Sequence, residues 1–138
     1  MEMVKTIAKD ITEIEYKIME KFFPGPLTII LKKKDIVPDI VTSGQETVGV
    51  RMPSGGIARK LVELSGVPIA TPSANISGQP SGTNLLEIKK HFEENVDFYI
   101  DGGNSELGIS STIVQVIDGK PKILRQGSIT LEQIEKEI

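Results

Sequence analysis

The sequence predicts an α/β fold: a single domain built on a twisted mixed sheet flanked by helices. Short apolar runs alternate with segments whose apolar residues recur at helical spacing. Near the C-terminus, two strand-like runs flank Asp118-Gly119, a pair typical of a tight hairpin turn, so part of the sheet is antiparallel. The chain of 138 residues shows no repeat or linker, and we expect residues 1–138 to form one domain.

The first elements are a helix and a buried strand. A helical apolar face follows Asp10, and Glu13 completes a start that resembles a capping box. Pro24-Gly25-Pro26 ends this helix, because proline cannot continue it. Residues 27–31 then predict a strand. The next three residues, Lys32-Lys33-Lys34, fit a solvated strand end better than a phosphate site.

A second strand is predicted over residues 47–52. Ser54 is a candidate cap for a helix with an apolar face, and Gly66 would end that helix. The apolar residues of this helix are Ile57, Leu61 and Leu64. Residues 67–70 predict the next strand, which leads into a loop of small residues.

The remaining elements follow from turn and cap signals. Asn84, with Glu87 three residues later, begins a helix that runs to about Phe92. Residues 98–100 predict a short strand before the turn Asp101-Gly102-Gly103. The hairpin strands are residues 112–117 and 122–124. Thr130 with Gln133 caps a last helix, and Ile129 packs on Ile134 as a hydrophobic staple.

Composition excludes several classes of protein. There is no cysteine, so a disulfide framework, a thiol nucleophile and a thiolate metal site are all absent. No apolar run approaches the ~20 residues that cross a bilayer, and no signal peptide is expected. We therefore expect a cytoplasmic protein with no membrane partner. The net charge of −3 argues against broad binding to nucleic acid, although a local basic patch remains open.

Familiar catalytic motifs are missing from the sequence. Neither the dinucleotide fingerprint nor the P-loop occurs. The single histidine, His91, lies among charged residues and is expected on a solvated helix face. Asp101 can coordinate Mg²⁺, but a turn explains it better. We predict no metal site formed by the protein.

What remains is a set of groups suited to a small anionic ligand. The loop from Thr71 to Gly82 carries hydroxyls and an amide at a predicted strand end, where α/β sheets bind ligands; a solvated connector is the alternative. Arg51 and Arg125 end apolar strands, and a guanidinium suits carboxylate or phosphate. These groups, with Ser111, would converge if their strands were neighbours.

Four motifs in order resemble the YrdC family. They are Lys21-Phe22-Phe23-Pro24-Gly25-Pro26-Leu27-Thr28, Val48-Gly49-Val50-Arg51-Met52-Pro53, Pro72-Ser73-Ala74-Asn75-Ile76-Ser77-Gly78 and Leu124-Arg125-Gln126-Gly127. The resemblance implies a twisted α/β sheet and synthesis of threonylcarbamoyl-adenylate from L-threonine, bicarbonate and ATP, with release of pyrophosphate. The enzyme would be a nucleotidyltransferase. Its product would serve the N6-threonylcarbamoyl modification of adenosine 37 in tRNA.

The resemblance also implies roles for single residues. Those on the L-threonine side would be Arg51, Thr71 and Ser111. Those on the ATP side would be Thr47, Ser73, Asn75, Ser81 and Arg125. Ser73 and Asn75 match the S-x-N half of a signature tetrad and, with Arg51, are the catalytic candidates. Mg²⁺ would arrive with ATP, and no tightly bound cofactor is expected.

The sequence departs from the family pattern in one large respect. The family's P-T-D-T-x-Y-G-L-like stretch and its K-x-R motif do not occur. We therefore expect a YrdC-like domain that is incomplete at its N-terminus, with a companion segment or a homo-oligomer supplying the rest. Possible partners also include tRNA and other proteins of the same modification pathway. The alternative is a non-catalytic module that binds nucleotide or double-stranded RNA.

Overall fold

The computed structural model describes residues 1–79, 82–103 and 110–138. The chain divides into two compact units, Met1–Ile69 with Ile109–Ile138, and Ala70–Gly108. Each unit is treated by itself below. None of the helices among the described residues has the length and apolar character that a bilayer crossing requires.

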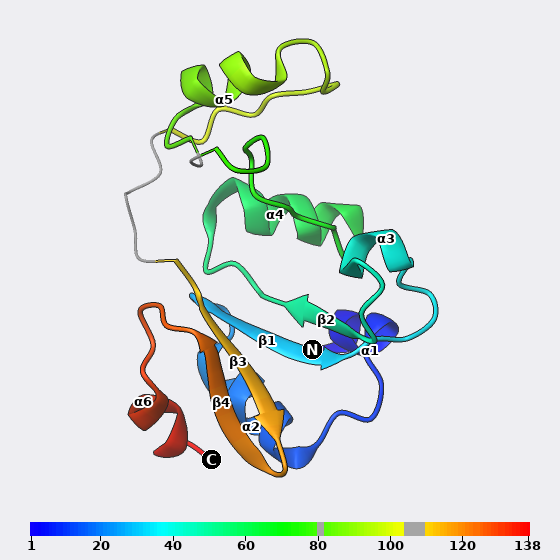
Figure 1. Ribbon diagram of the computed structural model, residues 1–138, viewed down its shortest axis with the longest axis vertical. Helices are drawn as coiled ribbons and strands as arrows, with labels where there is room; N and C mark the ends of the chain where they lie inside the picture. Colours follow the sequence, from blue (N-terminus) through cyan, green and yellow to red (C-terminus); the bar gives the residue numbers. More distant parts are fainter. Residues whose placement is uncertain (80–81, 104–109) are drawn as a thin grey trace. The chain divides into compact units, whose positions relative to one another are not determined.

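The larger unit contains a four-stranded mixed sheet (Figure 1). Its central strands β1 and β3 are parallel, and β2 and β4 pair antiparallel at the two edges, in the order β2-β1-β3-β4. The prediction of a mixed α/β fold is therefore confirmed. The strands are β1 Leu27–Lys32, β2 Thr47–Val50, β3 Thr112–Ile117 and β4 Lys120–Arg125.

Six helices accompany the strands in the described residues. In the larger unit they are α1 Glu2–Ile7, α2 Glu13–Phe22, α3 Asp39–Thr42, α4 Gly56–Ser65 and α6 Leu131–Glu135. The smaller unit contains α5 Leu85–Phe92. The sequence reading predicted neither α1 nor α3, each of which is at most six residues long and has a weak periodic signal.

Helix α2 packs its apolar face on one face of the sheet (Figure 1). Ile18 and Met19 of α2 are fully buried, and so are alternate strand residues of β1 and β3. The strand residues are Leu27, Ile29 and Val114. Since side chains alternate between the two faces of a strand, this burial pattern separates a core face from an open face. Thr28, Ile30, Ile113 and Gln115 lie on the open face and are only partly buried.

The start of α2 corrects the predicted cap. Thr12, not Asp10, is the N-cap: its hydroxyl accepts from the Glu15 N–H at 3.3 Å, and the Glu15 carboxylate accepts from the Thr12 N–H at 2.7 Å. Asp10 lies outside the helix with a φ of +53°. Both residue types cap helices, and a full capping box satisfies two backbone donors at once.

The turn and cap signals nearer the C-terminus are confirmed. Asp118 and Gly119 both have positive φ, as a tight hairpin turn between β3 and β4 requires. Thr130 and Gln133 form the capping box of α6. Ile129 and Ile134, the expected staple, both belong to the buried core.

Two predicted strands and one predicted cap are wrong. Residues 67–70 and 98–100 do not join the sheet, and Val67 and Phe98 are exposed. Apolar sequence favours a strand only where a neighbouring strand offers packing and pairing, so propensity alone misleads here. The N-cap of α4 is Gly55, without a side-chain hydrogen bond, instead of Ser54; Gly66 ends α4 as predicted. Strand β2 ends at Val50, two residues earlier than expected.

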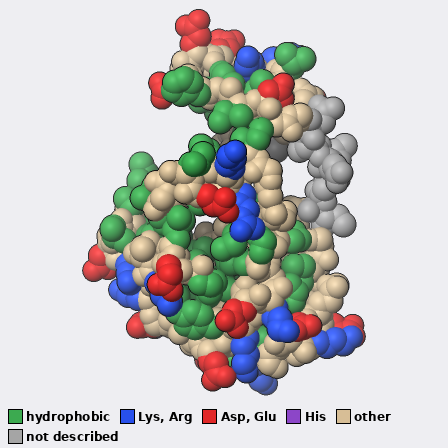
Figure 2. All heavy atoms as spheres, turned by 180° about the vertical axis from the view of Figure 1, so that it is seen from behind, with side chains coloured by type: hydrophobic (Ala, Val, Ile, Leu, Met, Phe, Trp, Pro, Cys, Tyr) green, Lys and Arg blue, Asp and Glu red, His purple; other side chains and the backbone are tan. Residues whose placement is uncertain are grey.

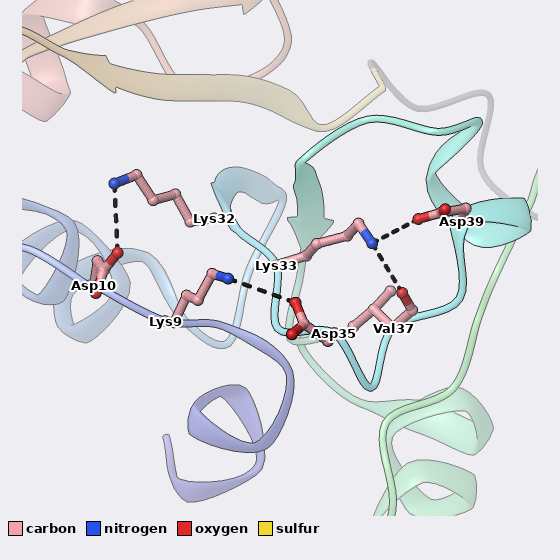
Figure 3. Close-up of polar contacts among 7 residues, drawn as sticks. All are labelled: Lys9, Asp10, Lys32, Lys33, Asp35, Val37 and Asp39. Carbon is pink, nitrogen blue, oxygen red and sulfur yellow. Dashed lines mark hydrogen bonds and ion pairs between the residues drawn. The ribbon is translucent and has the colours of Figure 1, made fainter.

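Lys32 and Lys34 are exposed, as predicted for a solvated strand end, whereas Lys33 makes two polar contacts within the fold (Figure 3). Lys33 is buried, and its ammonium donates to the Asp39 carboxylate at 2.8 Å and to the Val37 carbonyl at 3.1 Å. The bond to Asp39 raises the pKa of Lys33 above its ordinary value. Lys32 pairs with Asp10 at 3.4 Å. Lys33 therefore fastens the segment after β1.

Thr112, the first residue of β3, is fully buried and joins three parts of the larger unit. Its hydroxyl donates to the Ile129 carbonyl at 2.7 Å and accepts from the N–H groups of Gly127 and Ile129 at 3.1 and 3.0 Å. Its own N–H donates to the Pro26 carbonyl at 3.0 Å. One side chain thus satisfies the buried backbone of the loop before α6.

Replacing Thr112 with valine should lower the free energy of unfolding by about 2–4 kcal/mol, because the buried Ile129 N–H and the partly buried Gly127 N–H lose their acceptor. Urea denaturation measures this change. Thr112→Ser keeps the hydroxyl and serves as the control. Valine and serine variants of equal stability would contradict the role of the hydroxyl.

Candidate functional site

The predicted site residues of the larger unit lie on the open face of its sheet. Thr28 pairs with Ile113 in the parallel ladder, and Lys32 pairs with Thr47 in the antiparallel one. Paired residues share a face, and Lys32 lies on the same face of β1 as Thr28. Thr47 therefore lies on that face, and so does Arg51, four residues later. Ser111 directly precedes β3 on this face, and Arg125, which pairs with Ile113, ends β4.

Arg51 is held by the turn that leads into β1. Its Nε donates to the Gly25 carbonyl at 3.2 Å, and the Gly25 N–H donates to the Met52 carbonyl at 2.9 Å. The Arg51 side chain is otherwise exposed. The contact uses Nε, so the terminal nitrogens of the guanidinium are not part of it. An anchored, solvent-facing guanidinium is suited to a carboxylate or phosphate.

Arg125 and Ser111 form a second cationic group. Arg125 donates from Nε and Nη2 to the Ser111 carbonyl at 3.2 and 2.9 Å, and from Nη2 to the Ser111 hydroxyl at 3.1 Å. The Ser111 hydroxyl also lies 3.0 Å from the Thr28 hydroxyl. Thr28 of β1, Ser111 just before β3 and Arg125 of β4 therefore form a chain of contacts, which brings together two of the predicted residues, Ser111 and Arg125.

Thr47 lies at the opposite end of β2 from Arg51. It pairs with Lys32, whereas Val50 pairs with Ile29, near the start of β1. At ~3.3 Å per residue, Thr47 is on the order of 13 Å along the strand from Arg51. The open face thus carries two groups of predicted residues, one at each end of β2. Figure 2 shows acidic and basic side chains interspersed on the surface it views.

The predicted residues of the smaller unit lie in the loop before α5. Asn75 donates from its amide to the carbonyls of Ile76 and Gln79 at 3.0 and 2.9 Å, which closes a turn. Ser73 and Thr71 are exposed on the same loop. Ser81 lies outside the described residues. The loop is therefore an organised turn, with Asn75 as the side chain that holds it.

Helix α5 begins as predicted. The Asn84 side chain accepts from the Glu87 N–H at 3.0 Å. The Glu87 carboxylate accepts from the N–H and the hydroxyl of Thr83 at 2.8 and 3.2 Å. The bond from the Thr83 N–H is the main cause that holds the pKa of Glu87 below its ordinary value.

A shallow hollow in the smaller unit contains none of the predicted site residues. It measures about 190 Å³ and is lined mainly by residues at the start of α5 and by the turn at Asp101. The Asp101 carboxylate accepts from the Gly103 N–H at 2.9 Å, which confirms the predicted turn. His91, in the last turn of α5, is partly buried and not fully solvated as expected. Within residues 1–79, 82–103 and 110–138, no cluster of three or more histidine or acidic side chains could hold a metal ion.

Comparison with other proteins shows which family the sequence resembles. A family model named Sua5_yciO_yrdC, described as Telomere recombination, matches residues 1–127. The threonylcarbamoyl-AMP synthase of Pyrococcus abyssi (strain GE5 / Orsay) is 44% identical over 137 residues, which cover 99% of this chain and 40% of that protein. The protein of the same name from Bacillus subtilis (strain 168) is 43% identical over 122 residues, covering 88% of this chain and 35% of that protein.

Solved structures agree with the sequence matches. P. abyssi Sua5 complexed with L-threonine matches with a TM-score of 0.90 at 44% identity, over 99% of this chain and 40% of that one. The crystal structure of E. coli YciO matches with a TM-score of 0.82 at 27% identity, over 96% of this chain and 65% of that one. The chain spans less than half the length of the P. abyssi and B. subtilis synthases.

Gly127 lets the backbone of the loop before α6 approach Ser111 closely. A Cβ at this position would overlap the Ser110 carbonyl oxygen, the Ser111 carbonyl carbon and the Thr112 nitrogen. Gly127→Ala should lower the free energy of unfolding by about 1–3 kcal/mol and shift the Arg125 Nε–H resonance. Thermal denaturation and NMR measure the two effects. Gly55→Ala is the control, since a Cβ there meets no atom within 4 Å. Equal effects at the two glycines would contradict the close-approach argument.

The lowered pKa of Glu87 makes the start of α5 sensitive to acid. The ionised carboxylate is favoured in the folded state, so its stabilisation is present above the ordinary pKa and is lost as the pH falls through the lowered value. An NMR titration of the Glu87 carboxyl carbon should show this lowered midpoint. Thr83→Val removes the hydroxyl bond but keeps the N–H bond, so it should raise the midpoint partway. A midpoint unchanged in that variant would contradict the hydroxyl's contribution.

Proposed function

Since this chain belongs to the Sua5/YciO/YrdC family, we propose that it carries threonine- and nucleotide-binding residues of a threonylcarbamoyl-AMP synthase. The observation that carries the proposal is the 44% identity to the P. abyssi synthase across nearly the whole chain. The reaction would convert L-threonine, bicarbonate and ATP into threonylcarbamoyl-AMP and pyrophosphate, for the N6-threonylcarbamoyl modification of tRNA adenosine 37. Because the family model spans both compact units, we also propose that residues 1–138 belong to one YrdC-like domain.

The larger unit would contribute two anion-binding groups. Arg51, anchored through Nε, would hold the carboxylate of L-threonine with its terminal nitrogens, and Ser111 would lie on the same side. Arg125, fixed against Ser111, would contact the nucleotide phosphates. Thr47, at the other end of β2, would contact a different part of ATP. Preorganised donors of this kind stabilise developing negative charge without reorganising during the reaction.

The loop of the smaller unit would contribute the remaining groups. Thr71 would contact L-threonine, and Ser73, Asn75 and Ser81 would contact ATP. The chemistry needs no covalent enzyme intermediate, because holding the threonine carbamate in line with the α-phosphate supplies much of the rate. Mg²⁺, carried in with ATP, would neutralise phosphate charge.

The non-catalytic alternative is not favoured. Relatives named threonylcarbamoyl-AMP synthase from an archaeon, a bacterium and a yeast are 40–44% identical to this chain over 88% of it or more. We keep a cytoplasmic location, a homo-oligomer, tRNA and other proteins of the modification pathway as proposals. A companion segment with the family's K-x-R residues is a further proposed partner, since the sequence supplies only the S-x-N half of the tetrad.

Pyrophosphate release tests this function. We expect release that depends on L-threonine when the chain is mixed with ATP, Mg²⁺, bicarbonate and a polypeptide carrying the K-x-R segment. Arg51→Ala should reduce that release by at least about tenfold, because the carboxylate loses a charge-assisted partner. Lys60→Ala, at an exposed position in α4, is the control. If pyrophosphate release did not depend on L-threonine, either with or without the K-x-R polypeptide, the proposal would be overturned.

A further inference from the structure

One short segment, Gly25–Thr28, bonds Arg51 directly and contacts Ser111, the residue that bonds Arg125. It links α2 to the start of β1, where Arg51 bonds the Gly25 carbonyl and Ser111 contacts Thr28. We propose that this segment positions both arginines, and that the Thr28 hydroxyl is the residue-specific part of it. The ligand-binding consequence rests on the proposed function; the positioning itself does not.

The first half of the segment acts through its backbone. Gly25 offers its carbonyl to Arg51 Nε at 3.2 Å and its N–H to the Met52 carbonyl at 2.9 Å. Pro26 offers its carbonyl to the Thr112 N–H at 3.0 Å. The turn is therefore fixed to β2 on one side and to β3 on the other.

The second half acts through the Thr28 side chain. Its hydroxyl lies 3.0 Å from the Ser111 hydroxyl, which accepts from Arg125 Nη2 at 3.1 Å. Arginine can only donate, so the Ser111 oxygen must accept this bond. When Thr28 also donates to that oxygen, the Ser111 proton is free to turn toward a ligand. Thr28 therefore holds the Ser111 hydroxyl in place beside Arg125.

Packing fixes the Thr28 side chain in this orientation. A Cβ at Gly49 would lie 3.3 Å from the Thr28 methyl group, closer than ordinary contact, so the glycine leaves room for that methyl. A β-branched side chain has few rotamers, and with the methyl over Gly49 the hydroxyl faces Ser111. The fold does not need this hydroxyl for its core, since Thr28 is only partly buried while Leu27 and Ile29 on either side are fully buried.

The ligand-free chain gives the first test. Thr28→Val keeps the shape of the side chain and removes the hydroxyl. We expect exchange of the Arg125 Nη2 protons with solvent, measured by NMR, to accelerate several-fold, because Nη2 donates to the Ser111 hydroxyl that Thr28 contacts. Thr28→Ser should restore most of the protection. Thr6→Val is the matched control, because that hydroxyl bonds the Met3 carbonyl in α1. Unchanged exchange in Thr28→Val would overturn the positioning role.

Ligand binding gives the second test. Titration calorimetry with L-threonine, and separately with Mg²⁺–ATP, should show Kd values raised roughly fivefold to tenfold by Thr28→Val, as expected for one lost hydrogen bond. Equal affinities in Thr28→Val and the parent chain would overturn the consequence for binding. A parent chain that binds neither ligand would overturn the proposed function, while the exchange experiment still decides the positioning.

A further variant protects the test against misfolding. If Thr28→Val does not fold, Gly49→Ala should displace the Thr28 methyl and accelerate the same exchange. If the Arg125 side-chain protons exchanged at the same rate in Gly49→Ala as in the parent chain, the role of Thr28 would be overturned.

Discussion

The buried hydroxyl of Thr112 is the interaction on which the larger unit depends. A buried polar group is tolerated only when its hydrogen bonds are made, and this hydroxyl makes one as donor and two as acceptor. It fastens the loop of Gly127 and Ile129 to the start of β3. The neighbouring residue, Ser111, can then meet Arg125 at the end of β4. Thr112, which the packing of this loop requires, is thus the neighbour of Ser111, a candidate binding residue.

One face of the sheet carries the hydrophobic core, and the other carries the candidate binding residues. One face buries Leu27, Ile29 and Leu31 beneath α2, while the residues between them remain partly exposed. Strand alternation makes this division automatic, since neighbouring residues point to opposite sides. Polar residues such as Thr28 can therefore occupy the central strand without entering the core. The open face can then carry arginines whose burial would be costly.

The sequence predicts well those turns and helix caps that are formed by residues close together in the chain. Pro24-Gly25-Pro26, Asp118-Gly119 and the Thr130 capping box each act within a few residues, so the local pattern contains the whole cause. Burial of Lys33 is different, because it depends on the position of Asp39 after a turn. The strand predicted over residues 67–70 fails for a related reason, since a strand requires a partner that no local pattern supplies. The resemblance supplied the candidate site residues, but spacing could not show that Thr28 contacts Ser111.

The parallel pairing of β1 with β3 has a consequence for folding during synthesis. Thr28 and Ser111 are 83 residues apart in the sequence, and the smaller unit lies between them. As the chain leaves the ribosome, β1 can pair early with β2, but its other edge must wait for β3. Closing so long a loop is entropically costly and slow. Throughout that interval the central strand has an unpaired edge, which is the state most exposed to chaperones and to misassociation between nascent chains.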